Sequence, residues 1–275
     1  MPNQSLQSST TDDILQFLGC QVKTATLRNL NRLIHAYIRK VPWESVSRII
    51  KRQTITATAD CPRWPEEFWS DARQYGLGGT CFESSLAFYS LLISLGYPGY
   101  LTVNDMGESQ SCHAAIVILI KGQKYLVDIT IPVHKAVRFA PDQITRQASL
   151  FHNYAIRPVG PNTYHVERSR HPQRYIFTLI DVPVRLPDYC IRVEKDYSPA
   201  GFFLDRVVMA KIIDDRTWRF FSDQRPYKLE YFDRDGKYET LLTNELLPRS
   251  LAKKFNLPED KISTALSFIQ TVITP

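Results

Sequence analysis

The chain has 275 residues, 44% of them hydrophobic, and a formal net charge of +6. This length suffices for one large core or for a few small subdomains. Lys and Arg are spread along the chain without a basic run, so no nucleic-acid or membrane-binding patch is indicated, while the mild positive charge suits an anionic substrate. The five cysteines include no C-x-x-C pair, so neither a disulfide framework nor a metal site is expected.

The N-terminal segment, residues 1–11, is polar. It lacks the basic and apolar regions of a signal peptide, and no apolar run is long enough to cross a bilayer. We therefore expect a cytoplasmic protein whose thiols stay reduced.

The first part of the chain is predicted to be helical. Thr11 is expected to cap a short helix, and Thr24 a longer one that ends before Pro42. A further helix is expected over residues 65–75, because proline is tolerated in a first turn and Pro65 would stand there. A buried helix is then expected from Cys81 to Gly96.

After Gly96 the sequence alternates between apolar and polar residues, as strands do. Strands are expected at 100–103, 113–120, 124–131, 154–159, 163–167 and 175–182, and, beyond a proline-rich stretch, at 206–213, 218–222 and 228–232. Two last helices are expected at 246–255 and 261–273. We therefore predict an α+β chain with a helical subdomain (1–96), a small barrel or curled sheet (97–186) and a smaller mixed unit (187–275).

Residues 76–83, Gly-Leu-Gly-Gly-Thr-Cys-Phe-Glu, carry the strongest local motif. Glycines permit a sharp turn and a close backbone approach. Thr80 and Glu83 have the spacing of a capping box, which would make Cys81 the first residue of a helix. A thiol there lies at the positive end of the helix dipole, which favours the thiolate and lowers the thiol pKa. The alternative is an ordinary loop followed by a small buried cysteine.

His113 and Asp128 favour the catalytic interpretation. If the intervening turn centres on Lys121 and Gly122, Asp128 faces Ala115 across a hairpin, and His113 is its diagonal neighbour on the same face. A carboxylate in so apolar a run is costly unless it has a partner. A thiol nucleophile needs a base and a group that orients the base, so we predict Cys81, His113 and Asp128 as a catalytic triad.

Cys112, beside His113, is the rival thiol. Strand alternation points it to the opposite face, and it lacks a helix terminus. We expect it to be a core residue, as we expect of the other three cysteines.

At these residues the chain resembles the arylamine N-acetyltransferase family. Residues 78–83 match its Arg-Gly-Gly-x-Cys motif, His113 its histidine and 127–128 its Val-Asp pair, while 41–45, Val-Pro-Trp-Glu-Ser, are similar to its Pro-Phe-Glu-Asn segment. A weaker match in the tail comprises 196–199, 202–203 and 241–255.

The resemblance implies a helical bundle, an antiparallel β-barrel and a C-terminal α/β lid, with a papain- or transglutaminase-like triad. It implies an acyltransferase (EC 2.3.1 type) in which Cys81 takes the acetyl group of acetyl-CoA as a thioester and passes it to an arylamine or hydrazine in a ping-pong cycle. No permanently bound cofactor is implied. The partners would be an acyl-CoA donor and a small amine, with no nucleic acid or membrane. Candidate substrate-binding residues are Trp43, Phe82 and Thr80, and candidate structural residues near the site are Glu44, Gly78 and Gly79.

Three departures from the family pattern bear on the acetyl-CoA site and the arylamine preference. Leu77 stands where the family has arginine, so Glu44 would use Arg73 or another base. Trp43 and Ser45 replace phenylalanine and asparagine. Residues 129–132, Ile-Thr-Ile-Pro, replace a glycine-containing turn.

Two other functions stay open at this point. One is a transglutaminase-like thiol hydrolase or amide-forming enzyme that uses the same triad with another acyl donor. The other is a catalytically silent binding module of the same fold. The sequence leaves the acceptor amine, the oligomeric state and any regulation open.

Overall fold

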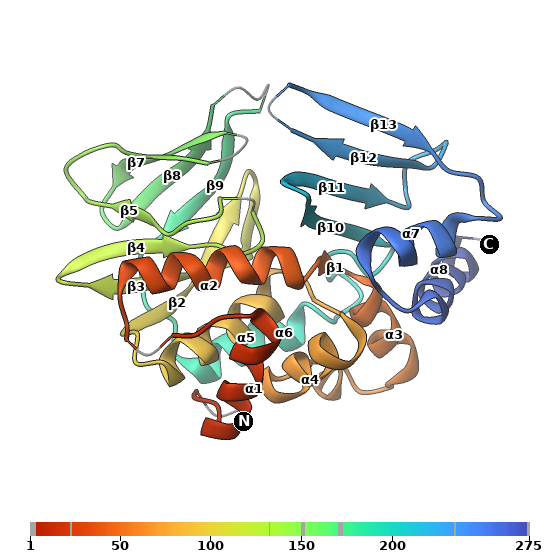
Figure 1. Ribbon diagram of the computed structural model, residues 1–275, viewed down its shortest axis with the longest axis horizontal. Coiled ribbons are helices and arrows are strands. Elements are labelled where there is room, and N and C mark those ends of the chain that lie inside the picture. The colour runs from red at the N-terminus through yellow and green to blue at the C-terminus, as the bar shows by residue number, and fades with distance from the viewer. Residues whose placement is uncertain are drawn as a thin grey trace. The chain divides into compact units, whose positions relative to one another are not determined.

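Figure 1 shows the computed structural model of the chain, which describes residues 4–22, 24–131, 133–149, 152–169, 173–233 and 235–273. The chain divides into two compact units. The first comprises Met1–Ile38 and Ser85–Tyr189, and the second Arg39–Ser84 and Cys190–Pro275. Each unit is thus built from two separate segments of the chain. The division into three subdomains at residues 96 and 186 stays a prediction.

The helices of the first unit begin slightly away from their predicted caps. Helix α1 (Ser8–Leu18) begins before Thr11, whose hydroxyl donates to the carbonyl oxygen of Gln7 at 3.0 Å, so Thr11 is not its cap. Helix α2 (Leu27–Lys40) begins three residues after Thr24. Its buried residues recur at helical spacing and form one apolar face: Leu30, Leu33, Ile34, Tyr37 and Ile38.

Helix α5 (Cys81–Ser94) is buried along most of its length, and it ends before Gly96, which has a left-handed φ of +78°. Phe88 of α5 packs edge-on against Tyr37 of α2, with ring centroids 5.0 Å apart. Helix α6 (Leu186–Lys195) was not predicted; it lies where the sequence suggested a proline-rich boundary.

An eight-stranded antiparallel sheet forms the rest of the first unit. Its strand order is β5-β4-β3-β2-β9-β8-β7-β6, and because β5 also contacts β6 the sheet nearly closes into a barrel. The strands are β2 (Gly99–Met106), β3 (Ser109–Ile120), β4 (Gln123–Val127), β5 (Val137–Phe139), β6 (Thr145–Ala148), β7 (Asn153–Gly160), β8 (Thr163–Arg168) and β9 (Tyr175–Ile180). Aliphatic and aromatic side chains such as Val117, Leu126, Tyr154 and Phe177 fill its core.

The β3–β4 hairpin has the predicted turn. Ile120 pairs with Gln123, so Lys121 and Gly122 form a two-residue connection. Both have positive φ, +51° and +73°, which is typical of the type I′ turn that matches the strand twist. The register that was assumed to place His113 and Asp128 on one face is therefore confirmed.

The second unit contains a five-stranded antiparallel sheet of order β1-β10-β11-β12-β13. Its first strand, β1 (Trp43–Glu44), comes from the early part of the chain and pairs with β10 at Ala210 and Met209. The other strands are β10 (Val208–Ile213), β11 (Arg216–Phe221), β12 (Lys228–Phe232) and β13 (Lys237–Leu241).

Helices α3 (Val46–Thr54), α7 (Leu247–Phe255) and α8 (Glu259–Ile273) share an apolar cluster with the sheet. Phe220, Leu251, Phe255 and Ile262 are fully buried there. The short helix η1 (Thr58–Asp60) and α4 (Pro65–Tyr75) complete the unit. The prediction of α4 is confirmed to the residue. It has Pro65 in its first turn, and Gly76 ends it with a φ of +69°.

Within the described residues, no helix combines the length and the apolar character that a membrane span requires.

Candidate active site

Cys81 is the first residue of α5, as predicted, and its side chain is partly exposed. The chain approaches it through Gly78 and Gly79 in a crowded path. A Cβ atom on Gly78 would lie 1.7 Å from the carbonyl oxygen of Pro42, and one on Gly79 would lie 3.1 Å from the Arg63 guanidinium. Gly78 is therefore required by the close approach of another backbone.

The predicted capping box at the start of α5 is wrong. The Thr80 hydroxyl accepts a hydrogen bond from Arg48, and the Glu83 carboxylate accepts hydrogen bonds from Arg63 and Tyr197. Both side chains are buried, Thr80 with 1% and Glu83 with 3% of its surface exposed. Buried arginines compete successfully for these oxygens because a hydrogen bond to a charged group is stronger than one to a backbone amide.

Glu44 connects β1, α3 and the glycine loop. Its Oε1 accepts hydrogen bonds from the Ser47 hydroxyl at 2.6 Å and the Gly78 amide at 3.1 Å, and its Oε2 accepts one from the Ser47 amide at 2.9 Å. Complete burial raises the pKa of the Glu44 carboxyl, although the positive charge of Arg63 opposes this. The structural role predicted for Glu44 thus has a basis, because it holds the backbone just before the cysteine.

Trp43 and Phe82 differ in exposure. Trp43 is partly exposed, and its ring meets that of Phe203 edge-on, with centroids 5.1 Å apart. Phe82 has only 3% of its surface exposed. A packing role accounts for Phe82, and substrate binding by Trp43, Phe82 and Thr80 stays a prediction.

His113 and Asp128 form a buried pair in the first unit. The Nε2 atom of His113 lies 2.7 Å from Oδ2 of Asp128, and the two side chains are 5% and 0% exposed. Asp128 directly follows the last residue of β4, next to the Ile116–Val127 pair of the hairpin. The ring of Phe177, which is fully buried, lies 4.6 Å from the imidazole, centroid to centroid.

The surroundings of Asp128 keep it ionised. Burial by itself raises the pKa of the carboxyl, but His113 and the hydrogen bonds of Thr130 outweigh it, so the pKa is lowered. The Thr130 amide donates to Oδ1 at 2.9 Å and its hydroxyl at 2.7 Å. Because an ionised carboxylate only accepts, Nε2 of His113 carries the hydrogen and Nδ1 is the basic nitrogen.

Cys81 belongs to the second compact unit, whereas His113 and Asp128 belong to the first. The triad as a set of three therefore stays a prediction.

Cys112, on β3, directs its Sγ to the carbonyl oxygen of Ser109 at 3.2 Å. Cys20, Cys61 and Cys190 are free thiols and are buried.

A family profile described as N-acetyltransferase matches residues 26–262, which include Cys81, His113 and Asp128. The chain belongs to the arylamine N-acetyltransferase family. It is accordingly an N-acetyltransferase, an enzyme of class EC 2.3.1. A comparison with curated protein sequences found no match.

Solved structures of this family share the fold. The arylamine N-acetyltransferase of Mycobacterium abscessus matches with a TM-score of 0.79 at 18% identity, over 98% of this chain and 99% of that one. A Bacillus cereus enzyme with a Cys-His-Glu triad matches with a TM-score of 0.75 at 16% identity, over 91% and 99%. The Mycobacterium marinum enzyme in complex with CoA matches with a TM-score of 0.76 at 15% identity, over 91% and 96%. The predicted α+β fold is confirmed.

The departures from the family pattern have structural counterparts. Leu77 is 4% exposed and belongs to the apolar cluster of the second unit, together with Leu251 and Phe255. The base whose charge acts on Glu44 is Arg63, one of the other bases that the prediction left open beside Arg73. Ser45 donates to the carbonyl oxygen of Arg206 at 2.9 Å and accepts from the Val208 amide, thereby joining β1 to β10. In the 129–132 segment, Pro132 lies outside the described residues.

Sequence reasoning missed a group of buried charges near Cys81. Arg48 and Arg63 are each 1% exposed, and they pair with Asp196 at 2.6 Å and with Glu83 at 2.9 Å. Tyr197 donates to Glu83 at 2.5 Å. The one signal in the sequence was the weak tail match that includes Asp196 and Tyr197. No local pattern distinguishes Arg48 or Arg63 from surface arginines.

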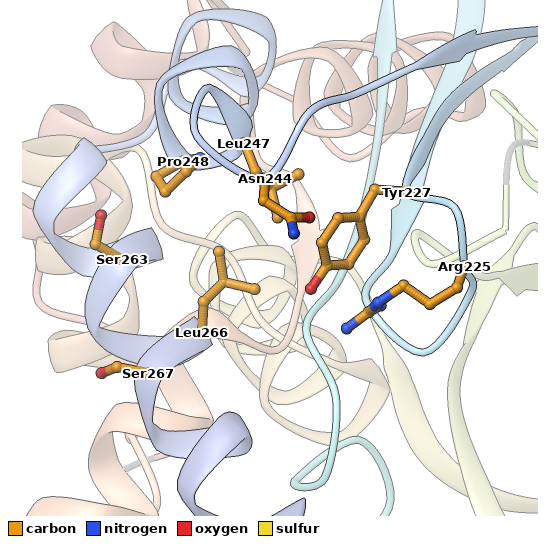
Figure 2. Close-up of a pocket in the computed structure, with 8 residues that line it drawn as sticks. All are labelled: Arg225, Tyr227, Asn244, Leu247, Pro248, Ser263, Leu266 and Ser267. Atoms are coloured by element: carbon orange, nitrogen blue, oxygen red, sulfur yellow. The ribbon is translucent and has the colours of Figure 1, made fainter.

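A cavity of about 320 Å³ in the second unit contains none of the predicted site residues. Figure 2 shows the residues that line it, with Arg225 and Tyr227 on one side and Ser263, Leu266 and Ser267 of α8 on the other. Arg225 is exposed, and its guanidinium carbon lies over the Tyr227 ring, 3.7 Å from the ring centroid.

The described residues include no group of three or more His, Cys, Asp or Glu that could hold a metal ion.

Proposed function

We propose that the protein transfers an acetyl group from acetyl-CoA to the amino group of an arylamine or hydrazine, through a thioester on Cys81. The observation that carries the proposal is the buried His113–Asp128 pair at 2.7 Å. An orienting carboxylate and a basic imidazole are the groups that a thiol nucleophile requires, and Cys81 opens a helix. The CoA bound by the Mycobacterium marinum relative supports acetyl-CoA as the donor.

In the proposed first half-reaction, His113 Nδ1 takes the proton of Cys81 and the sulfur attacks the carbonyl carbon of the donor. The bond between that carbon and the CoA sulfur breaks, and CoA leaves as a thiol with the proton from His113. In the second half-reaction the amine nitrogen attacks the acetyl carbon. The bond to Cys81 breaks, and the proton lost by the amine returns to the sulfur through His113.

Asp128 has the role of orienting group in this scheme. Its ionised carboxylate accepts from Nε2 and so leaves Nδ1 as the base. Backbone amides around Cys81 are the proposed donors to the developing oxyanion. Trp43, partly exposed beside Phe203, is the proposed wall of the acceptor pocket.

Intact-mass spectrometry after incubation with a panel of acyl-CoA esters tests the proposal. We expect a mass increase of one acetyl group on the wild-type protein and on Cys112→Ala, and none on Cys81→Ala. Added arylamine or hydrazine should then remove the acetyl group and yield the N-acetyl product. Steady-state rates should give the parallel double-reciprocal lines of a ping-pong cycle.

Two results would overturn the proposal. Failure of every ester to acylate the wild-type protein would exclude acyl-CoA as donor. Acylation followed by equally fast loss to water with and without amine would instead indicate a thiol hydrolase.

A further inference from the structure

Arg63 is a buried arginine between η1 and α4, and its side chain is 1% exposed. One terminal nitrogen donates to Oε2 of Glu83 at 2.9 Å and to the carbonyl oxygen of Gly78. The other donates to Oδ2 of Asp71 at 3.2 Å. The backbone amide of Arg63 donates to Oε1 of Glu83 at 2.9 Å. Arg63 is thus held by both its side chain and its main chain.

The partners of Arg63 lie on both sides of Cys81 in the sequence. Gly78 precedes the cysteine in the glycine loop, and Glu83 follows it in the first turn of α5. One guanidinium therefore fixes both the segment that enters the helix and the turn that carries the thiol. A rigid planar guanidinium holds two acceptors at set angles, which a rotating ammonium does less well.

The charges of this cluster depend on one another. Burial by itself raises the pKa of Glu83, but Arg63 and the Tyr197 hydroxyl outweigh it, so the pKa of the carboxyl is lowered. If Arg63 is removed, a buried carboxylate loses its ion-pair partner, and such a change is strongly unfavourable. The carboxylate would then leave its position or take up a proton, and the first turn of α5 would shift with it.

Position 77 does not offer this support. Leu77 lies in an apolar cluster with Leu251 and Phe255, so its side chain packs among hydrophobic groups. We propose that Arg63 positions Cys81 for acyl transfer, and that it supplies the cation that the cysteine motif of this chain lacks at position 77. This inference rests on the proposed function, in which Cys81 is the nucleophile.

The test compares Arg63→Leu, Arg63→Lys and the wild type by the rate at which iodoacetamide alkylates Cys81 from pH 5 to pH 10. Peptide mass spectrometry assigns the label to each cysteine. In Arg63→Leu we expect the rate at neutral pH to fall by about tenfold or more and the pH profile to change, since small displacements of a reacting group have large effects. Arg63→Lys, which keeps the charge but not the planar fork, should give a rate between those of Arg63→Leu and the wild type.

Arg249→Leu is the matched control, because Arg249 is an exposed arginine on α7 of the same unit. It should leave the alkylation profile unchanged. Circular dichroism and thermal unfolding show whether each variant is folded. If Arg63→Leu does not fold, Glu83→Gln decides, since it removes the same ion pair and should slow alkylation in the same way.

Acetyl transfer provides a second measurement. The positioning role predicts that Arg63→Leu lowers kcat while KM for acetyl-CoA stays within about twofold, because the lost interaction acts on the reacting group. Folded Arg63→Leu or Glu83→Gln protein with the wild-type alkylation rate and pH profile would overturn the inference. Alkylation needs no acyl donor. If acetyl-CoA failed to react with the wild type, the proposed function would be refuted, but the alkylation rates of the variants would still show whether Arg63 positions Cys81.

Discussion

The Nε2 atom of His113 lies 2.7 Å from Oδ2 of Asp128, although the two residues are 15 positions apart in the chain. The tight turn at Lys121 and Gly122 fixes the register that brings them together. Both residues belong to the same compact unit, and they lie on or next to the two strands of one hairpin. It is therefore a suitable place to test the proposed chemistry by small changes.

Asp128→Asn should lower kcat for acetyl transfer by about a hundredfold to ten-thousandfold, since a carboxamide no longer holds the imidazole in the useful tautomer. Thr130→Val is the comparison. It removes one hydrogen bond to Asp128 and keeps the amide that donates at 2.9 Å, so its effect should be smaller than about tenfold. Stopped-flow measurement of thioester formation checks both. A folded Asp128→Asn protein with unchanged kcat would contradict the role of the carboxylate.

Gly78→Ala should destabilise the fold and misplace Cys81. The added Cβ would lie 1.7 Å from a backbone oxygen, and neither side has a flexible end that can move away. We expect a loss of about 2 to 4 kcal/mol in the free energy of unfolding, measured in urea, with slower alkylation of Cys81. Gly160→Ala, whose Cβ would have its nearest neighbour at 3.9 Å, should change stability by less than about 1 kcal/mol.

Glu83→Gln should destabilise the protein in a pH-dependent way. The pKa of Glu83 is lowered in the folded state. The ionised carboxylate therefore contributes to the free energy of unfolding at pH values above the ordinary pKa of 4.5, and this contribution is lost as the pH falls through the folded-state pKa. At pH 7 the variant should lose about 3 kcal/mol of unfolding free energy, because a buried ion pair is broken. Urea titrations at pH 7 and at successively lower pH should show this difference shrinking. A difference that stays constant would mean that the charge of Glu83 has no part in it.

Lys211→Met should stabilise the protein at neutral pH. Burial, together with the charge of Lys40, lowers the pKa of Lys211 to about 8. Because the amine pKa is lowered, the protonated Lys211 reduces the free energy of unfolding at pH values below about 8. This destabilisation disappears as the pH rises toward 10.5. The expected gain is about 1 to 2 kcal/mol at pH 7, less than the pKa shift implies because the bond to the Phe255 carbonyl is lost.

Unfolding in urea at pH 7 and near pH 10 measures this gain. It should vanish at the higher pH. Lys253→Met, at an exposed lysine of α7, should show no such pH dependence.

Local signals were sufficient where local chemistry decides the structure. Pro65 in a first turn and Gly76 after a last turn marked α4, and the two-residue turn at 121–122 set the hairpin register. The position of Cys81 at a helix start and the pairing of His113 with Asp128 also followed from the sequence. In each case the deciding interaction lies within a few residues or within one hairpin.

Long-range interactions decided the features that were missed. The apolar residues of α3 share an apolar cluster with those of α8, which is far away in the sequence. Strands β5 and β6 are too short to show the alternation of apolar and polar residues that identifies a strand. The helix α5 begins at Cys81 as predicted, but its capping box was predicted wrongly because Arg48 and Arg63 take the oxygens of Thr80 and Glu83. Arginine is usually a surface residue, so the sequence alone does not predict a buried one. The burial of Arg48 and Arg63 is explained by their ion pairs with Asp196 and Glu83, which only the folded structure shows.

The two-residue strand Trp43–Glu44 pairs with β10, whose first residue is Val208. During synthesis the ribosome must therefore deliver more than 160 further residues before this pairing can form. Glu44 holds the amide of Gly78, so a nascent chain that stops before β10 lacks part of the framework of the cysteine loop. The thiol is translated early, whereas the strand that pairs with the segment carrying Glu44 is translated much later, so the surroundings of the cysteine loop are completed only after β10 has emerged.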